Sequence, residues 1–337
     1  MKQSLKRLAQ GVIAPFGPIL WRARPTPRLL VLMYHRVLPA SHPDRPREQP
    51  GMFVSPETLA LHVEIVQRHF ELVHLEDWAR DVTSGRPVPR LACALTFDDG
   101  WRDNFEYAFP ILRSGAVPAT VYLLPDLVGT RYSFWPNRLA RLLGDPCNNE
   151  HRAGWPDWLL RALAAVGVGR TAPLPLSMVE IDAVIGCLKN AYTDDAILRL
   201  LDDLAVMDDG VGDRDLMNWD EIRQMAAGGK IRFGSHTRRH IRLDSRVPLD
   251  VLQNEIRASR ELIEQQVRSP VSSFCYPNGD HCPAAVELVR GSYSTAVTTR
   301  RGWNSTVTDA YLLNRVGVHE DVSNSAAAFL SRLALAG

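Results

Sequence analysis

Short apolar segments separated by helical stretches constrain the fold of this chain more than any other feature. Strands that are apolar on both faces are typical of parallel sheets covered on both sides, and parallel neighbours need crossover connections, usually helices. The roughly seven segments are Arg28–Val37, Leu91–Phe97, Ala119–Leu124, Lys230–Gly234, Val271–Tyr276, Ser294–Thr298 and Leu312–Val316. Their number and alternation predict an α/β fold in which the strands form a closed or nearly closed barrel.

Residues 134–227 interrupt this alternation, because they show helical periodicity broken by proline and glycine. We interpret this region as a helical insertion into a barrel formed by residues 28–133 and 228–337. Residues 1–27 form an N-terminal arm, whose apolar segment Gly11–Trp21 is too short to span a membrane. The arm is either a peripheral membrane anchor or a segment packed on its own domain.

Charge and cysteine content narrow the possible functions and compartments. The formal net charge is +1, so there is no global electrostatic case for binding nucleic acid. The five cysteines are scattered and form no CxxC pair, which argues against a disulfide framework. We therefore expect a cytoplasmic protein, or one peripheral to the inner face of the membrane.

The second apolar segment ends in two adjacent carboxylates, Asp98 and Asp99, followed by Gly100. Two neighbouring carboxylates repel each other and are costly to bury, and a nearby cation would remove that cost. Because Asp and Gly are also good turn formers, an ordinary strand-to-loop turn is the alternative.

Two histidines, His236 and His240, follow the fourth segment. Residues four apart share one face of a helical turn, where two imidazoles are close enough to bind one metal ion. Two surface histidines on a basic loop are the alternative. One carboxylate with two imidazoles leaves open positions on Zn²⁺ or a similar ion, as catalytic sites do, and the second carboxylate could act as general base.

These segments resemble the polysaccharide deacetylase family, also called carbohydrate esterase family 4 or the NodB-homology domain. Thr96–Gly100 matches the first motif of the family, TFDDG, and His236–His240 matches the second, H-[ST]-x-x-H. Phe274–Gly279 resembles the third motif, which has Tyr-Pro followed shortly by Gly. The resemblance spans roughly Leu29–Val318 and implies a distorted (β/α)7 barrel.

The resemblance also implies roles for individual residues. Asp99, His236 and His240 would bind a divalent metal ion, in the first place Zn²⁺, with Co²⁺ or Ni²⁺ as alternatives. Asp98 would be the general base, and the backbone N–H of Tyr276 would help to stabilise the oxyanion.

Two features of the family are not in their usual places. The arginine that orients the base is absent from Ser269–Phe274, and Arg36 and Arg315 at predicted strand ends are the two candidates to replace it. The general-acid histidine is either His319 or His35, because in some family members a circular permutation moves its strand to the N-terminus. We favour His35.

The resemblance implies metal-dependent hydrolysis of an N-acetyl or other N-acyl group on an amino sugar. The expected partner is an acylated amino sugar of a surface polysaccharide, lipopolysaccharide or glycolipid precursor, either as a glycan or linked to lipid. A catalytically inactive carbohydrate-binding protein is the alternative, which the missing arginine favours. A structural zinc protein would need a fourth protein ligand, and none is evident.

Overall fold

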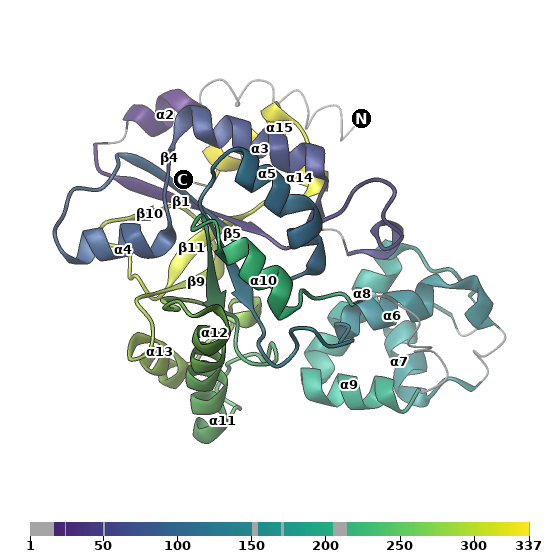
Figure 1. The fold of residues 1–337 in the computed structure, drawn as a ribbon. Helices are drawn as coiled ribbons and strands as arrows, with labels where there is room; N and C mark the ends of the chain where they lie inside the picture. The colour runs from purple at the N-terminus through teal and green to yellow at the C-terminus, as the bar shows by residue number, and fades with distance from the viewer. Residues whose placement is uncertain are drawn as a thin grey trace. The chain divides into compact units, whose positions relative to one another are not determined.

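Figure 1 shows a computed structural model of the protein. It describes residues 17–23, 25–49, 51–149, 154–169, 172–204 and 214–336. The described residues form two compact units, which we call the barrel unit and the helical unit. The barrel unit is drawn from residues 1–39, 51–130 and 214–337, and the helical unit from residues 40–50 and 131–213.

Within the described ranges, seven parallel strands of the barrel unit close into a barrel. They are β1 (Arg28–Tyr34), β5 (Leu91–Phe97), β6 (Ala119–Leu123), β7 (Ile231–Ser235), β8 (Ser273–Cys275), β9 (Thr295–Arg301) and β11 (Leu313–Gly317). Their spatial order is β1-β11-β9-β8-β7-β6-β5, and β5 pairs back with β1 along its whole length. The predicted (β/α)7 barrel is confirmed.

Four two-residue strands accompany the barrel. β4 (Glu71–Leu72) pairs with β5 in parallel, and β10 (Asn304–Ser305) pairs with β1 in the antiparallel direction. β2 (Arg36–Val37) and β3 (Phe53–Val54) form a separate pair just after β1. This second pair fixes the backbone that follows His35.

Neighbouring residues of each barrel strand face different cores. In β1, Leu29 and Val31 belong to the cluster inside the barrel, whereas Leu30 and Leu32 pack with the outer helices. β5 repeats this alternation. Because both faces of each strand are buried, the strands read in the sequence as continuous apolar segments.

Helix α4 (Leu75–Thr83) closes the N-terminal end of the barrel. Its Leu75 and Trp78 share one buried cluster with Leu29, near the start of β1, and Leu313, at the start of β11. This helix was not predicted from the sequence. The carboxyl ends of the strands lie at the other end of the barrel, and the candidate site is built there.

The aromatic ring of Tyr122 fills part of the barrel interior and requires a glycine beside it. A Cβ atom at Gly234 in β7 would lie 2.5 Å from two carbons of that ring. The hydroxyl groups of Tyr122 and Ser273 form a buried hydrogen bond of 2.7 Å. Gly234 therefore allows β7 to approach the ring just before the strand delivers His236.

Helices surround the barrel, as Figure 1 shows. They are α3 (Pro56–His69), α5 (Phe109–Ser114), α10 (Trp219–Ala226), α11 (Leu249–Gln253), α12 (Ser259–Val267), α13 (Pro283–Arg290), α14 (Glu320–Ser323) and α15 (Ala326–Ala334). The π-helical turn Asn104–Ala108 leads into α5, and a second π-helical turn, Asn254–Ala258, joins α11 to α12. Residues of both π-helical turns contact segments of the candidate site.

The N-terminal arm is described only in part, since residues 1–16 lie outside the described residues. Its helix α2 (Gly17–Ala23) packs on the barrel unit through Trp21, whose ring lies 5.3 Å from that of Phe70 and 5.6 Å from that of Trp303. Ile19 on the same helix is 64% exposed. None of the helices in the described part of the chain combines the length and apolar character needed to cross a bilayer.

The helical unit has a hydrophobic core of its own. Its helices are α6 (Trp135–Gly144), α7 (Asp157–Ala165), α8 (Met178–Ala191) and α9 (Asp194–Asp202). Ser177 caps α8 in a reciprocal arrangement with Glu180. The bounds of this unit differ from the predicted insertion, because residues 40–50 join it and α10 belongs to the barrel unit.

Candidate active site

The two carboxylates that follow β5 take different directions. Asp98 continues the strand, and its N–H donates to the Tyr34 carbonyl at 2.9 Å. Asp99 has a φ of 73°, in the left-handed region that few residues other than glycine adopt. Gly100 follows with a φ of 72°, and a Cβ there would lie 2.9 Å from the Leu123 side chain. This turn separates the side chains of two adjacent acids.

Asp98 forms a buried, bidentate ion pair with Arg315 of β11. The two guanidinium Nη atoms donate to the two carboxylate oxygens, each at 2.7 Å. The other guanidinium N–H groups donate to the Thr298 carbonyl, the Thr96 hydroxyl and the Cys275 sulfur. All five donors of this buried arginine are therefore used, and of the two predicted substitutes it is Arg315 that meets Asp98.

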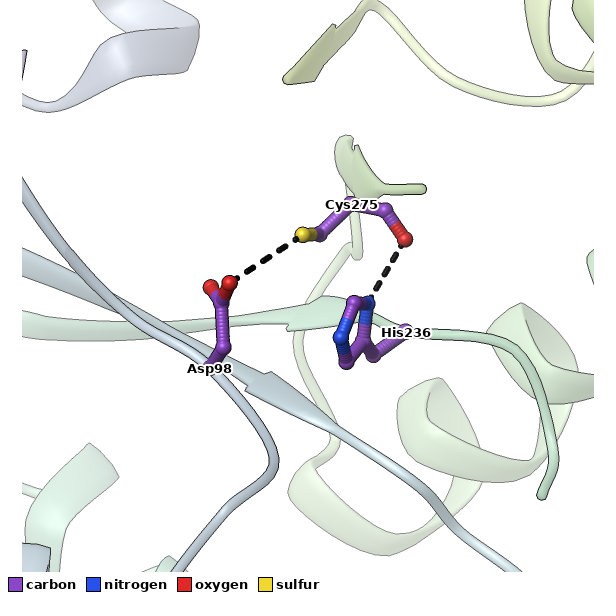
Figure 2. A group of neighbouring side chains, drawn as sticks. All are labelled: Asp98, His236 and Cys275. Atoms are coloured by element: carbon purple, nitrogen blue, oxygen red, sulfur yellow. Dashed lines mark hydrogen bonds between the residues drawn. The ribbon is translucent and has the colours of Figure 1, made fainter. Parts of the chain in front are cut away.

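Cys275 in β8 links Asp98 to His236, as Figure 2 shows. Its thiol lies 3.6 Å from Asp98 Oδ2, and its backbone carbonyl accepts a hydrogen bond of 2.7 Å from His236 Nδ1. A carbonyl can only accept, so Nδ1 carries the proton and the lone pair of the ring lies on Nε2. No signal in the sequence pointed to this cysteine.

Asp99, His236 and His240 converge on one point. Asp99 Oδ1 lies 3.5 Å from His236 Nε2 and 3.6 Å from His240 Nε2. Trp101 Nε1 donates to the other oxygen, Asp99 Oδ2, at 3.0 Å. Asp99 Oδ1 is buried and has no hydrogen-bond partner among the described residues. The structure thus brings together the three predicted metal ligands around an unsatisfied oxygen.

The segment that joins the two histidines is a turn, and the predicted helical spacing is wrong. His236 follows directly after β7, while Thr237 and His240 have φ values of 68° and 64°. The Thr237 hydroxyl accepts a hydrogen bond of 2.9 Å from the His240 N–H. These left-handed residues bend the backbone so that both imidazoles face Asp99. The two histidines therefore meet without a helical turn between them.

Burial and neighbouring charges shift the pKa values of Asp98 and Asp99 in opposite directions. Burial alone would raise the pKa of Asp98, but the Arg315 guanidinium outweighs it and holds that pKa well below its usual range. Burial raises the pKa of Asp99 to about 6, with the negative Asp98 acting in the same direction. Burial and the neighbouring His240 lower the pKa of His236 to about 3. A neutral imidazole at position 236 is suited to bind a metal ion.

His35 lies at the same end of the barrel, between β1 and β2. Its Nε2 is 3.8 Å from Asp98 Oδ2, and its side chain is 20% exposed. The other candidate, His319, precedes α14 and pairs with Asp321. Of these two histidines, the structure places His35 beside Asp98.

The π-helical turn before α5 holds the His35 segment. Asn104 donates to the His35 carbonyl at 2.8 Å, and the buried carboxylate of Asp103 accepts from Arg36 Nε at 2.9 Å and from the Val37 N–H at 2.8 Å. Arg36 therefore pairs with Asp103. Its guanidinium carbon lies 4.3 Å from the centre of the Trp101 ring.

The backbone N–H of Tyr276 does not fit the role predicted for it. It donates to the Val297 carbonyl at 3.2 Å, as part of the pairing between β8 and β9. An N–H used within the sheet is not directed at an oxyanion. The Tyr276 side chain is buried, and its hydroxyl has no hydrogen-bond partner among the described residues.

Among the described residues, two groups of side chains could hold a metal ion, namely Asp98 with His236 and Cys275, and Asp99 with His236 and His240. In each group the ligand atoms lie within 4.8 Å of one another. Both oxygens of Asp98 already accept from Arg315, and burial raises the pKa of the Cys275 thiol well above its usual value. The group that contains Asp99 therefore fits a metal ion better.

The family model described as polysaccharide deacetylase matches residues 85–155 and 198–292. The chain belongs to the polysaccharide deacetylase family. The matched ranges contain Asp98, Asp99 and the two histidines of the turn, whereas His35 and Arg315 lie outside them. Membership makes this deacetylase an enzyme that acts on sugars, in line with the interpretation of the sequence.

Solved structures of other deacetylases share the fold. The Streptococcus pyogenes deacetylase PplD, in complex with acetate, is 16% identical with a TM-score of 0.58, over 91% of this chain and 99% of that chain. IcaB from Ammonifex degensii is 19% identical with a TM-score of 0.56, over 90% and 97%. The de-N-acetylase from Aggregatibacter actinomycetemcomitans is 14% identical with a TM-score of 0.54, over 90% and 99%. A search of curated proteins gave no match.

Proposed function

We propose that this deacetylase hydrolyses the N-acetyl, or another N-acyl, group of an amino sugar, and that Asp99, His236 and His240 hold a divalent metal ion for the reaction. The observation that carries the proposal is the buried Asp99 Oδ1, which has no hydrogen-bond partner among the described residues and faces two imidazole nitrogens.

The donor set fits such an ion. A buried polar atom left without a partner costs about 1–3 kcal/mol, and coordination would remove that cost. One carboxylate and two imidazoles suit Zn²⁺, with Co²⁺ or Ni²⁺ as alternatives, and three protein ligands leave room for water and substrate. When bound, the ion polarises the acyl carbonyl and lowers the pKa of water.

Asp98 is the proposed general base. Arg315 keeps its carboxylate ionised although it is buried. In the reaction the attacking water forms a bond to the acyl carbon and gives its proton to Asp98. Because Arg315 grips both oxygens, the carboxylate also stays in one orientation while the proton moves.

His35 is the proposed general acid. Its side chain is partly exposed, and its Nε2 gives a proton to the sugar nitrogen as the carbon–nitrogen bond breaks, so that acetate and a free amine leave. Asp98 then carries the extra proton and His35 lacks one. The separation of 3.8 Å between Asp98 Oδ2 and His35 Nε2 allows the proton to pass back and restore both groups, directly or through one water.

The proposed substrate is an acylated amino sugar of a surface polysaccharide, lipopolysaccharide or glycolipid precursor. The position of His35 beside Asp98 supports amide hydrolysis, because a leaving amine needs a proton donor. One structural neighbour carries the name de-N-acetylase. All five cysteines are free thiols, which supports action in the cytoplasm or at the inner face of the membrane.

Acetate release from N-acetylglucosamine oligosaccharides tests this proposal. Wild-type protein is expected to release acetate and an equal amount of free amine, and Asp98→Asn is expected to lose the activity. Asp244→Asn is the matched control, because Asp244 pairs with Arg246 in a surface loop. Release of acetate from O-acetylated sugars alone, with no new amine, would contradict N-deacylation.

A further inference from the structure

The turn that carries His236 and His240 is held by a carboxylate from outside it. Thr237 and His240 both adopt left-handed backbone conformations, which are strained for residues other than glycine and persist only where surrounding contacts enforce them. The internal hydrogen bond from the His240 N–H to the Thr237 hydroxyl spans one side of this turn. The middle residues of the turn are fixed by Glu255.

Glu255 accepts hydrogen bonds from two consecutive backbone N–H groups of the turn. Its Oε2 lies 2.8 Å from the Arg238 nitrogen and 3.2 Å from the Arg239 nitrogen. Its Oε1 accepts from the Arg239 side chain at 3.1 Å. Successive N–H groups that point the same way form an anion-binding concavity, and here the anion is a side chain of the protein itself.

The Glu255 side chain is completely buried, so its carboxylate depends on these hydrogen bonds. Glu255 is 0% exposed, and a carboxylate removed from water is tolerated only where it is paired and hydrogen-bonded. The side chain of its charged partner, Arg239, is half exposed, whereas the Glu255 carboxylate that accepts all three hydrogen bonds is buried. Moving the turn would leave the Glu255 carboxylate without these donors.

A π-helical turn aims Glu255 at the turn. Glu255 lies in Asn254–Ala258, between α11 and α12, where the helix carries an extra residue. Such turns displace side chains from their ordinary helical positions and are frequent at functional sites. The preceding residue, Asn254, accepts from Arg238 Nη1 at 2.9 Å, so two neighbouring residues of this π-helical turn hold the same segment.

We propose that Glu255 is a positioning residue for the metal-ligand pair His236 and His240, a role that rests on the proposed function of these two histidines. It contacts neither imidazole in the hydrogen bonds described above and acts through the backbone of Arg238 and Arg239. Its loss leaves the three ligands in the chain but frees the turn that sets the distance between the two imidazoles and Asp99.

Glu255→Gln tests this role, because an amide has the same size but carries no charge and only one acceptor oxygen. It can therefore accept from the two backbone N–H groups or from the Arg239 side chain, but not from both. Glu264→Gln on α12 is the matched control: its Oε1 also accepts a backbone N–H, that of Val271 at 2.9 Å, and an arginine side chain, Arg260 Nε at 3.0 Å. Glu255→Asp, which keeps the charge with a shorter reach, is the second variant in case the first does not fold.

The measurement is Co²⁺ affinity, by competition with a chelator, together with the visible absorption spectrum of the Co²⁺ protein and the thermal stability of the metal-free protein. Glu255→Gln is expected to weaken Co²⁺ binding about tenfold to a hundredfold and to alter the spectrum, with a smaller effect in Glu255→Asp. Glu264→Gln is expected to match the wild type in both, even where it lowers stability. Wild-type affinity and spectrum in a folded Glu255 variant would overturn this inference alone, whereas a wild type that binds no Co²⁺ would overturn the proposed function with it.

Discussion

Arg315 meets Asp98 across the inside of the barrel with two parallel hydrogen bonds of 2.7 Å. Arg315 lies in β11 and Asp98 directly follows β5, and both side chains are almost completely buried. The arginine keeps the carboxylate ionised, and the carboxylate in turn raises the pKa of the arginine against the opposing effect of burial. A buried acid that stays charged is what the proposed general base requires.

Arg315→Lys is predicted to lower kcat by about tenfold to a hundredfold, because a lysine ammonium cannot grip both oxygens of Asp98 in a planar fork. KM and metal content are expected to stay near the wild-type values, since Arg315 contacts none of the three proposed ligands in the hydrogen bonds described here. Steady-state kinetics of acetate release and elemental analysis measure these quantities. An unchanged kcat would show that this pair does not support the base.

His35→Gln is predicted to lower kcat by about a hundredfold or more, because the leaving nitrogen loses its proton donor. The same change at the other candidate, His319→Gln, is expected to have little effect, because that residue pairs with Asp321. The comparison uses the same acetate-release assay. If His319→Gln shows the larger loss, the assignment of the acid is reversed.

Acid is predicted to destabilise the protein through His62. Its Nε2 donates to the Ser323 carbonyl at 2.7 Å, and its Nδ1 accepts from the Tyr34 hydroxyl at 3.1 Å. Burial lowers the pKa of His62 to about 4, and the hydrogen bond to Ser323 opposes this only in part. In the unfolded chain His62 binds a proton at about pH 6.5, whereas in the folded chain it does so only near pH 4. The free energy of unfolding therefore decreases as the pH falls from about 6.5 toward 4.

The expected contribution of His62 is a loss of roughly 2 kcal/mol in the free energy of unfolding between about pH 7 and pH 5. Urea unfolding at both pH values, with EDTA present, measures it without interference from bound metal. His62→Gln is expected to remove that part of the loss, while His74, whose pKa burial also lowers to about 4, keeps its own. An equal pH dependence in wild type and variant would contradict this account.

The sequence carried enough information for the strands and for the acids and histidines of the site. The strands are apolar on both faces because an inner and an outer core flank them. A polar residue directly after such an apolar segment therefore stands out in the sequence and indicates a residue of the site. Asp98 and Asp99 after β5, and His236 after β7, are of this kind. His35 after β1 was recognised in the same way, although His319 stayed open as an alternative.

Other contacts could not be read from the sequence, because they depend on backbone geometry and on pairing across the barrel. Arg315 and Arg36 both stand at strand ends, and only the arrangement of β11 around the barrel shows which one reaches Asp98. The helical spacing predicted for the two histidines failed because left-handed residues bend that segment. Glu255 lies within an ordinary amphipathic helical pattern, and no local signal marks the π-helical turn that directs it inward.

The neighbouring acids are predicted to respond differently to substitution. Asp98→Asn is expected to abolish turnover while the protein keeps its metal ion. Both oxygens of Asp98 accept hydrogen bonds from Arg315, so Asp98 is not one of the proposed ligands. Asp99→Ala is expected to lose the ion, because Asp99 supplies the only carboxylate oxygen of the proposed ligand set. Two acids next to each other in sequence would thus be separated by function.

Metal content by elemental analysis, in protein without a chelating tag, tests this division most directly. We predict about one zinc, cobalt or nickel ion per chain in the wild type and in Asp98→Asn, and none in Asp99→Ala. No bound metal in the wild type after incubation with these ions, or full metal content in Asp99→Ala, would contradict the proposed metal-dependent deacetylase.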